Sequence, residues 1–119
     1  MPAHFVLKQD INNDFYFHFL DTNDEVILLS GRYENRESTE AEIKDVKLNS
    51  LMSQQLAGGK TPDGKMFFII KGSDGNVLVK SVLYTSQMTM DNALHCVKDN
   101  ACVAEIIDFE LSHEFRVNP

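Results

Sequence analysis

Two Ser–Tyr pairs are the side chains whose types and spacing could do chemistry in this sequence. Ser30 and Tyr33 recur 51 positions later as Ser81 and Tyr84. A serine becomes a nucleophile only when a base lies within hydrogen-bond reach, and no histidine recurs between the two copies to supply one. We therefore expect each serine to end a strand and each tyrosine to fill the following strand-to-helix corner. A small-ligand site or an enzyme that uses these corners stays as the alternative hypothesis.

The remaining chemical motifs are weaker. Cys96 and Cys102 do not show zinc-site spacing, although His95 adjoins the first of them. The run Gly58-Gly59-Lys60-Thr61 looks like the end of a phosphate-binding loop, but Gln54 stands where that loop needs a glycine. It is interpreted as a flexible connection, the four histidines as incidental surface residues, and no catalytic residue, metal or cofactor is predicted.

Composition limits the class of protein. The chain has 119 residues, of which 43% are hydrophobic, and a formal net charge of −7. It has room for one folded domain, and its single, scattered Lys and Arg residues argue against a nucleic-acid partner. We expect a cytoplasmic protein, because there is no apolar run long enough to cross a membrane and no secretory signal at the start.

The elements that must position these side chains come from an internal repeat. The segment 15–50 aligns without a gap on segment 66–101. A repeated unit of this kind buries its apolar face against its neighbour. The identical pairs are Phe17 and Phe68, Val26 and Val77, Ser30 and Ser81, Tyr33 and Tyr84, Val46 and Val97, Lys47 and Lys98, and Asn49 and Asn100.

Each copy reads as three strands followed by a helix. Opening strands are expected at 4–7 and 54–57, aromatic strands at 15–20 and 66–71, and returning strands at 25–30 and 76–81. Phe15, Phe17 and Phe19 alternate with polar or smaller side chains at period two, which indicates a strand with one core face. The dipeptide Asp74-Gly75 favours a hairpin turn.

The two helices show matching start and stop signals. Asn35 and Ser86 are N-cap residues, and Asn49 and Asn100 are placed at left-handed C-caps. The expected buried stripes are Thr39, Ile43, Val46 and Ser50 in the first helix, and Met90, Leu94, Val97 and Ala101 in the second. A closing strand is expected at 103–109, and the tail beyond it alternates apolar and polar residues.

These motifs resemble those of the YegP-like family, small tandem-repeat bacterial proteins of uncharacterised function. The pattern stands here as residues 25–33 followed by 43–49, and it recurs as 76–84 followed by 94–100. The resemblance implies an α+β fold in which the strand after each helix crosses to the other half. It implies no established activity.

The prediction is an α+β protein: two tandem β-β-β-α repeats forming one antiparallel sheet with a C-terminal closing strand and both helices on one face. Residues 1–119 form a single domain of two pseudo-symmetric repeats, about 4–53 and 54–109, with a tail at 110–119. Tyr16, His18, Phe67 and Ile69 then lie on the other face of the sheet, which we interpret as a platform for a protein or peptide. A homodimer through the sheet edge or the tail is compatible with this non-enzymatic role.

Overall fold

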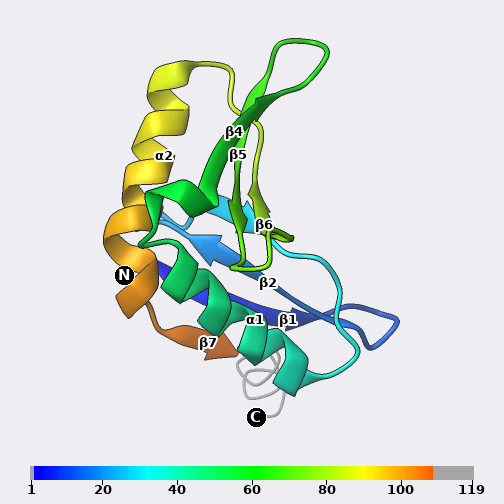
Figure 1. Ribbon diagram of the computed structural model, residues 1–119. Coiled ribbons are helices and arrows are strands. Elements are labelled where there is room, and N and C mark those ends of the chain that lie inside the picture. The colour runs from blue at the N-terminus through cyan, green and yellow to red at the C-terminus, as the bar shows by residue number, and fades with distance from the viewer. Residues whose placement is uncertain (1, 109–119) are drawn as a thin grey trace.

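The computed structural model describes residues 2–108 (Figure 1). Its elements follow the order three strands, one helix, three strands, one helix and one strand, with a short 3-10 helix after each α-helix. They are β1 (His4–Gln9), β2 (Phe15–Leu20), β3 (Val26–Leu29), α1 (Arg36–Asn49), η1 (Ser53–Gln55), β4 (Leu56–Lys60), β5 (Met66–Lys71), β6 (Val77–Ser81), α2 (Gln87–Asn100), η2 (Ala101–Val103) and β7 (Ile106–Asp108). Below, the first half means residues 4–49 and the second half residues 56–100.

All seven strands form one sheet in the order β4-β5-β6-β3-β2-β1-β7. The halves meet at its centre, where β3 pairs antiparallel with β6. The strand that follows α2 returns to the first half and pairs parallel with β1. The prediction of a wholly antiparallel sheet is therefore wrong: the sheet is mixed. No short turn joins β7 to β1, so the antiparallel sense that a hairpin imposes does not apply to this pair.

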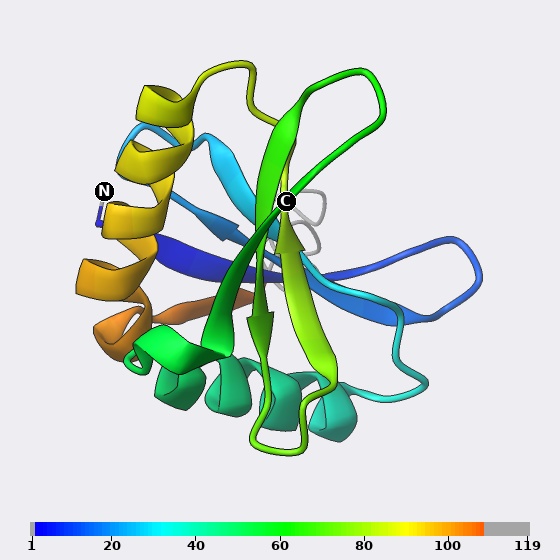
Figure 2. The ribbon, with the colours of Figure 1, turned by 45° about the horizontal axis from the view of Figure 1, so that its top comes forward.

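The sheet is strongly twisted, and the strands of the two halves run in clearly different directions (Figure 2). A β-bulge in each half adds to this twist. In the first half the register passes from the pair Phe19–Leu28 to the pair Leu20–Val26, so Ile27 is an extra residue. The bulge allows the consecutive side chains Ile27 and Leu28 both to be buried. Leu78 is the extra residue at the same place in the second half.

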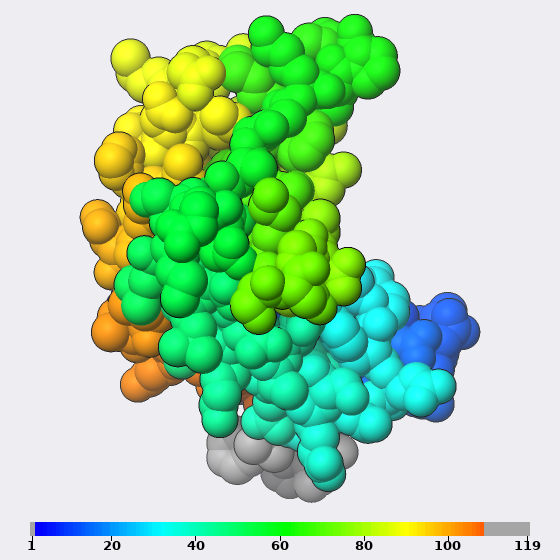
Figure 3. Space-filling model, viewed as in Figure 1, coloured from blue at the N-terminus to red at the C-terminus, as the bar shows by residue number. Residues whose placement is uncertain are grey.

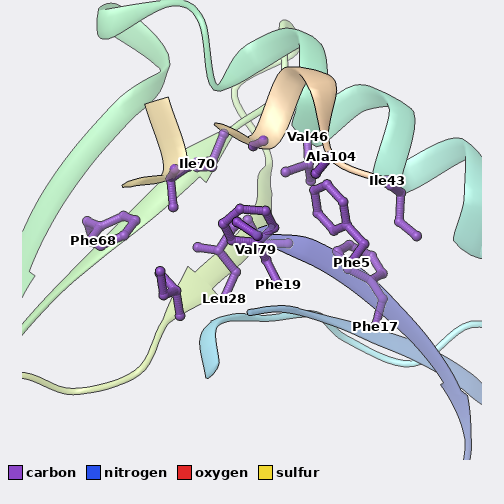
Figure 4. Packing of buried hydrophobic residues seen from close by; sticks show 14 of the residues in the cluster. Phe5, Phe17, Phe19, Leu28, Ile43, Val46, Phe68, Ile70, Val79 and Ala104 are labelled. Atoms are coloured by element: carbon purple, nitrogen blue, oxygen red, sulfur yellow. The ribbon is translucent and has the colours of Figure 1, made fainter. Parts of the chain in front are cut away.

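The core lies between one face of the sheet and the two helices. Sheet side chains converge on Ile43 and Val46 of α1 (Figure 4), and Val97 of α2 is fully buried. The first half contributes the ring cluster Phe5, Phe17 and Phe19, whose rings are in contact. The helix stripes pack on one face, and within residues 2–108 no helix covers the opposite face of the sheet. The expected stripe residues are buried, except that Leu94 is half-buried.

The helix starts are as predicted, and the helix ends are not. The Asn35 side chain accepts a hydrogen bond from the Ser38 N–H, and the Ser86 side chain accepts one from Thr89. Asn49 and Asn100 are not left-handed caps. Each carboxamide instead donates to the backbone carbonyl four residues earlier, and the chain continues into a right-handed turn.

The strand that opens the second half corrects another prediction. Gly58 and Gly59 belong to β4 and are not a flexible connection, because each pairs with a phenylalanine of β5. The opening strand starts at Leu56, since residues 53–55 form η1. The hairpin formed by β4 and β5 projects at the top of the molecule in Figure 3. The closing strand β7 starts at Ile106 and not at 103, because residues 101–103 form η2. Phe109 and the tail 110–119 lie outside the described residues.

Candidate functional site: the outer face of the sheet

The face of the sheet opposite the helices, here called the outer face, carries the four predicted partner-binding residues. Strand pairing fixes their places. His18 lies between Val6 and Leu29, and Ile69 lies between Lys80 and Ala57. Because Leu29 pairs with Lys80, these residues form one row across six strands. All four predicted residues are half-buried.

Tyr16 lies two residues from His18 on β2 and makes a small cluster with it. The two rings meet edge-to-face with centroids 5.4 Å apart. The Arg32 guanidinium lies over the Tyr16 ring, 4.0 Å from its centroid, and its Nε is 3.1 Å from a carboxylate oxygen of Asp10. The ring is thus held between a neighbouring imidazole and an oriented cation, and a cation over a ring stabilises its position.

Phe67 occupies the matching place on β5. The Lys80 ammonium lies 4.7 Å from the Phe67 ring centroid. The ring also covers Gly59 on β4, where an added Cβ would come within 2.6 Å of a ring carbon. A glycine under an aromatic ring in the neighbouring strand is a known means of stabilising a strand that lacks a side chain. Each half therefore presents one aromatic ring with one cation over it.

The structure does not gather the four residues into one patch. Tyr16 contacts His18, and Phe67 shares β5 with Ile69, but β3 and β6 separate the two pairs. At the usual strand spacing they lie ~14 Å apart across the sheet. Because β2 and β5 run in opposite directions, Tyr16 and Phe67 lie on opposite sides of the central row, roughly 20 Å from each other at ordinary strand dimensions. The two ring–cation sites stand diagonally across the outer face.

His18 is more enclosed than a surface histidine. Its Nδ1 is buried and has no hydrogen-bond partner among the described residues. Burial lowers the pKa of His18, and the positive charges of Lys8 and Arg32 lower it further. His4 is also buried, and its Nδ1 lies 2.9 Å from the Pro2 carbonyl oxygen. The expectation that all histidines are incidental surface residues is therefore wrong for these two.

Charge is distributed unevenly between the sheet and the rest of the chain. Strands β1 to β6 contain Lys8, Lys60, Lys71 and Lys80 and no acidic residue. The acidic residues that produce the net charge of −7 lie in turns, helices and the C-terminal part of the chain. The sequence did not identify Arg32 and Lys80 as site residues, because each cation approaches its aromatic ring only when the sheet forms. Lys80 lies on this face because it pairs with Leu29 and Ile69, and no pattern along β6 indicates which ring it covers.

The Ser–Tyr corners are built into the backbone. The Ser30 hydroxyl accepts a hydrogen bond from the Phe17 N–H at 2.8 Å and donates to the Gly31 carbonyl at 2.8 Å. Ser81 does the same with Phe68 and Val82. Each hydroxyl thus replaces a strand partner at a corner where the backbone ladder stops, which satisfies an amide that would otherwise be unpaired. Both hydroxyls have their donor and acceptor capacity engaged by the backbone.

The two corner tyrosines pair with the strand before them and differ in their surroundings. Tyr33 bridges to Phe15, and Tyr84 bridges to Met66. The Tyr33 hydroxyl donates to a Glu42 carboxylate oxygen at 3.2 Å, and burial, with the negative charge of Glu42, raises the pKa of Tyr33. Burial, with the nearby charges of Asp21 and two further groups, raises the pKa of Tyr84 to about 12.

A hollow lies where each helix approaches the hairpin of the other half. One, of about 350 Å³, lies between α1 and the β5–β6 turn and is lined by Glu42, Asp45 and Asp74 among others. The other, of about 260 Å³, lies between α2 and the β2–β3 turn and includes Tyr84 and Cys96. Burial raises the pKa of the Cys96 thiol, so this thiol is not activated as a nucleophile at neutral pH.

Within residues 2–108 no group of three or more His, Cys, Asp or Glu side chains is arranged to hold a metal ion. Cys96 and Cys102 are both free thiols. No helix among the described residues is long and apolar enough to span a bilayer.

Fold and surface together define a small α+β protein with one mixed sheet, two helices on one face and ring–cation sites on the other. The chain belongs to the family described as "Domain of unknown function (DUF1508)", whose profile matches residues 10–53 and 62–108. This is the YegP-like family that the sequence motifs predicted.

Relatives and solved structures agree with this assignment. The chain is 32% identical to UPF0339 protein PA0329 of Pseudomonas aeruginosa over 82% of this chain and 89% of the relative. The solution structure of UPF0339 protein SO3888 from Shewanella oneidensis superimposes with a TM-score of 0.85 at 27% identity, covering 91% and 92% of the two chains. That of yegP from E. coli, described as a protein of unknown function, gives 0.84 at 26% identity, covering 92% and 94%.

Proposed function

We propose that this protein is a non-enzymatic binding module, built from two copies of one β-β-β-α unit, that takes an extended, acidic polypeptide segment across its outer face. The observation that carries the proposal is the pair of ring–cation sites, Tyr16 under Arg32 and Phe67 under Lys80. Half-buried aromatic rings are frequent anchors at protein interfaces because they bury large areas at low entropic cost.

The spacing of the sites favours an extended ligand. An extended chain covers about 3.3 Å per residue, so a span of roughly 20 Å corresponds to about six residues. A small molecule would reach only one of the two sites. The free thiols Cys96 and Cys102 are consistent with the cytoplasmic location that we propose.

Charge supports an acidic ligand. The described strands that form the outer face carry only basic charges there, since Asp108 is on the other face, opposite Leu7. An acidic segment would also be repelled by the helices and turns, which hold most carboxylates, and would therefore be directed to the sheet.

The experiment is a selection of peptides from a displayed library on the intact protein, followed by affinity measurements on the selected peptide. The Tyr16→Ala, Phe67→Ala double variant is expected to bind at least about tenfold more weakly, because each truncated anchor costs more than about 1 kcal/mol. A Met88→Ala, Val103→Ala double variant is the matched control, since both side chains are exposed apolar residues elsewhere.

The salt dependence gives a second measurement. Lys80→Gln and Arg32→Gln should weaken binding and reduce its sensitivity to salt, because each removes one screened attraction. Equal affinity of the selected peptide for wild type and for the Tyr16→Ala, Phe67→Ala variant, with an unchanged amide spectrum, would show that the outer face is not the binding surface.

A further inference from the structure

The outermost strands of the two halves, β1 and β4, differ in whether another strand pairs with their outer edge. On β1, the edge that faces away from β2 is paired with β7, which lies parallel to it. On β4, the corresponding edge has no strand partner among residues 2–108. β4 lies at the margin of the second half, beside β5 (Figure 2). The sheet thus shows an occupied position in one half and the equivalent position open in the other.

The backbone groups at the open edge of β4 belong to the residues that match those of β1 which pair with β7. The Phe5 N–H donates to the Glu105 carbonyl at 2.9 Å, on the side of β7. Leu56 stands at the matching place, and its N–H also points away from β5, to the Ser53 carbonyl. Backbone groups of alternate residues point the same way, so Gly58 and Lys60 face the open edge. Both residues are exposed.

The outer-face side chains of β4 are smaller than those of β1. Where β1 has Val6 and Lys8 on the outer face, β4 has Ala57 and Gly59. The ring of Phe67 lies over Gly59 and occupies the space that a side chain at position 59 would take. A side chain on a strand added next to β4 could reach that ring directly. In the first half the same place is filled, because Ile107 of β7 pairs with Val6 and Val6 is only 7% exposed.

Charges near the open edge are mostly basic, and Asp63, in the turn after β4, is paired with Lys65. The strands of the second half contain Lys60, Lys71 and Lys80 and no acid. On the occupied edge, the carboxylate of β7 that ends the strand, Asp108, forms an ion pair with Arg36 of α1. At the matching place in α2 stands Gln87, so at the β4 edge the basic charge offered to an acidic occupant is that of Lys60 on β4 itself.

We infer that β4 is a strand-addition site: it takes an extended segment of another protein, parallel to β4, with bulky apolar side chains on the outer face and acidic residues between them. Main-chain hydrogen bonds supply the affinity and the side-chain pattern the specificity, as in other cases of β-augmentation. This site shares Phe67 with the outer-face site but needs neither Tyr16 nor Arg32, so the two proposals can be tested apart.

The probe is a labelled synthetic peptide with the sequence of residues 104–111, Ala-Glu-Ile-Ile-Asp-Phe-Glu-Leu, capped at both ends. It contains the segment that already fits the β1 edge. In a titration of the full, isotope-labelled chain, we expect saturable amide shifts centred on residues 56–60. A peptide N-methylated at residue 107, on the backbone edge that carries the Glu105 carbonyl, is expected to lose binding.

Two variants of one residue test the edge itself. Gly58→Pro removes the N–H that faces the open edge. Gly58→Ala keeps it, and the added Cβ makes an ordinary contact with the Phe67 carbonyl oxygen, 3.8 Å away. We expect Gly58→Pro to weaken the peptide about tenfold or more, the loss of about one hydrogen bond, and Gly58→Ala to change it by less than about twofold. If Gly58→Pro does not fold, the N-methylated peptide still decides the question.

Three results would overturn the inference. Shifts centred on residues 4–7 would mean that the peptide displaces β7. Equal binding of the N-methylated peptide would exclude main-chain pairing. A dimer that is seen by light scattering and abolished by Gly58→Pro would show that the edge serves a second copy of this chain. Loss of binding in the Gly58→Pro variant with the Tyr16→Ala variant unaffected would support the edge site independently of the outer-face proposal.

Discussion

The first and second halves show the same order of strands and helix and differ at the margin of the sheet. Both contain the capped helix, the β-bulge and the serine at the corner. At the sheet margin they differ: β1 is covered by β7, and the β4 edge is open among the described residues. Shared features are those that hold a strand or helix together locally. The sheet margin is where the two halves differ in their neighbours, which is why we place the strand-addition site there.

The interiors of the halves also differ. The first half buries three phenylalanine rings, and the matching positions in the second half hold one ring with leucine and isoleucine. Aromatic rings in contact contribute more than their buried area alone. The first half should therefore be the more tightly held part of the core, a difference that the following substitutions measure.

The largest effect is expected for the matched phenylalanines Phe17 and Phe68. Phe17→Ala should cost about 4 kcal/mol and Phe68→Ala about 3 kcal/mol, within the range for buried phenylalanines. The difference arises because Phe17 also contacts the rings of Phe5 and Tyr33, with centroids 5.9 and 6.3 Å away. Urea unfolding measures both. Ile11→Ala, at a position 97% exposed, is the control, and equal losses at Phe17 and Phe68 would contradict the comparison.

The corner serines come next. Ser81→Ala should cost about 2 kcal/mol, because it leaves the Phe68 N–H without its acceptor at a corner that is only 2% exposed. Ser30→Ala should cost about 1 kcal/mol, since water can reach that half-buried corner. Chemical denaturation with exposed Ser73→Ala as the control tests this pair. An equal or larger loss at Ser30 would disprove the role of burial.

The hairpin turns give a smaller and opposite pair of effects. Asp24 has a φ of 61° and Gly75, at the matching place, a φ of 86°. Asp24→Gly should stabilise the protein by about 0.5 kcal/mol and Gly75→Ala should destabilise it by about 1 kcal/mol, because only glycine takes this conformation without strain. Thermal unfolding of both variants, beside Gly31→Ala at a position without a positive φ, measures the difference. A loss of stability in Asp24→Gly would contradict this.

The last prediction concerns Tyr84 and the stability of the protein at alkaline pH, and no effect is expected at neutral pH. The pKa of Tyr84 is raised from 10.0 to about 12, so the unfolded phenol ionises before the folded one. Its contribution is complete below pH 10 and is lost as pH rises through about 12. Tyr84→Phe should therefore lose less stability than wild type between about pH 9 and pH 12. Thermal unfolding across this range, with absorbance at 295 nm for the phenolate, is the measurement, and parallel pH profiles would refute the shift.

Local signals allowed much of this fold to be predicted from the sequence. Alternation along 15–20 and 66–71 identified two strands, and Asn35 and Ser86 marked both helix starts. Each signal depends on a few neighbouring residues. Asn49 and Asn100 misled because an asparagine at a helix end can also bond back to the preceding turn. Gly58 and Gly59 suggested a flexible connection, because a glycine-rich strand is stabilised by its neighbouring strand and not by its own side chains. Here the ring of Phe67 on β5 covers Gly59.

The candidate site was predicted in part. The four side chains on the outer face followed from period-two alternation, which a strand imposes by itself. The cations over the rings, Arg32 and Lys80, did not follow, because each comes from a different strand or loop. The separation of the site into two diagonal halves depends on the order of the strands, which local alternation does not contain.

By itself, then, the sequence determined the aromatic strands, the helix starts and which side chains of a strand share a face, since these arise from interactions between residues close in the chain. Only the tertiary structure decided that β7 joins β1 in parallel, that β4 keeps an open edge, and which cation lies on which ring. These outcomes depend on pairing between segments distant in sequence, whose free energies are set by packing of the whole sheet rather than by any local pattern.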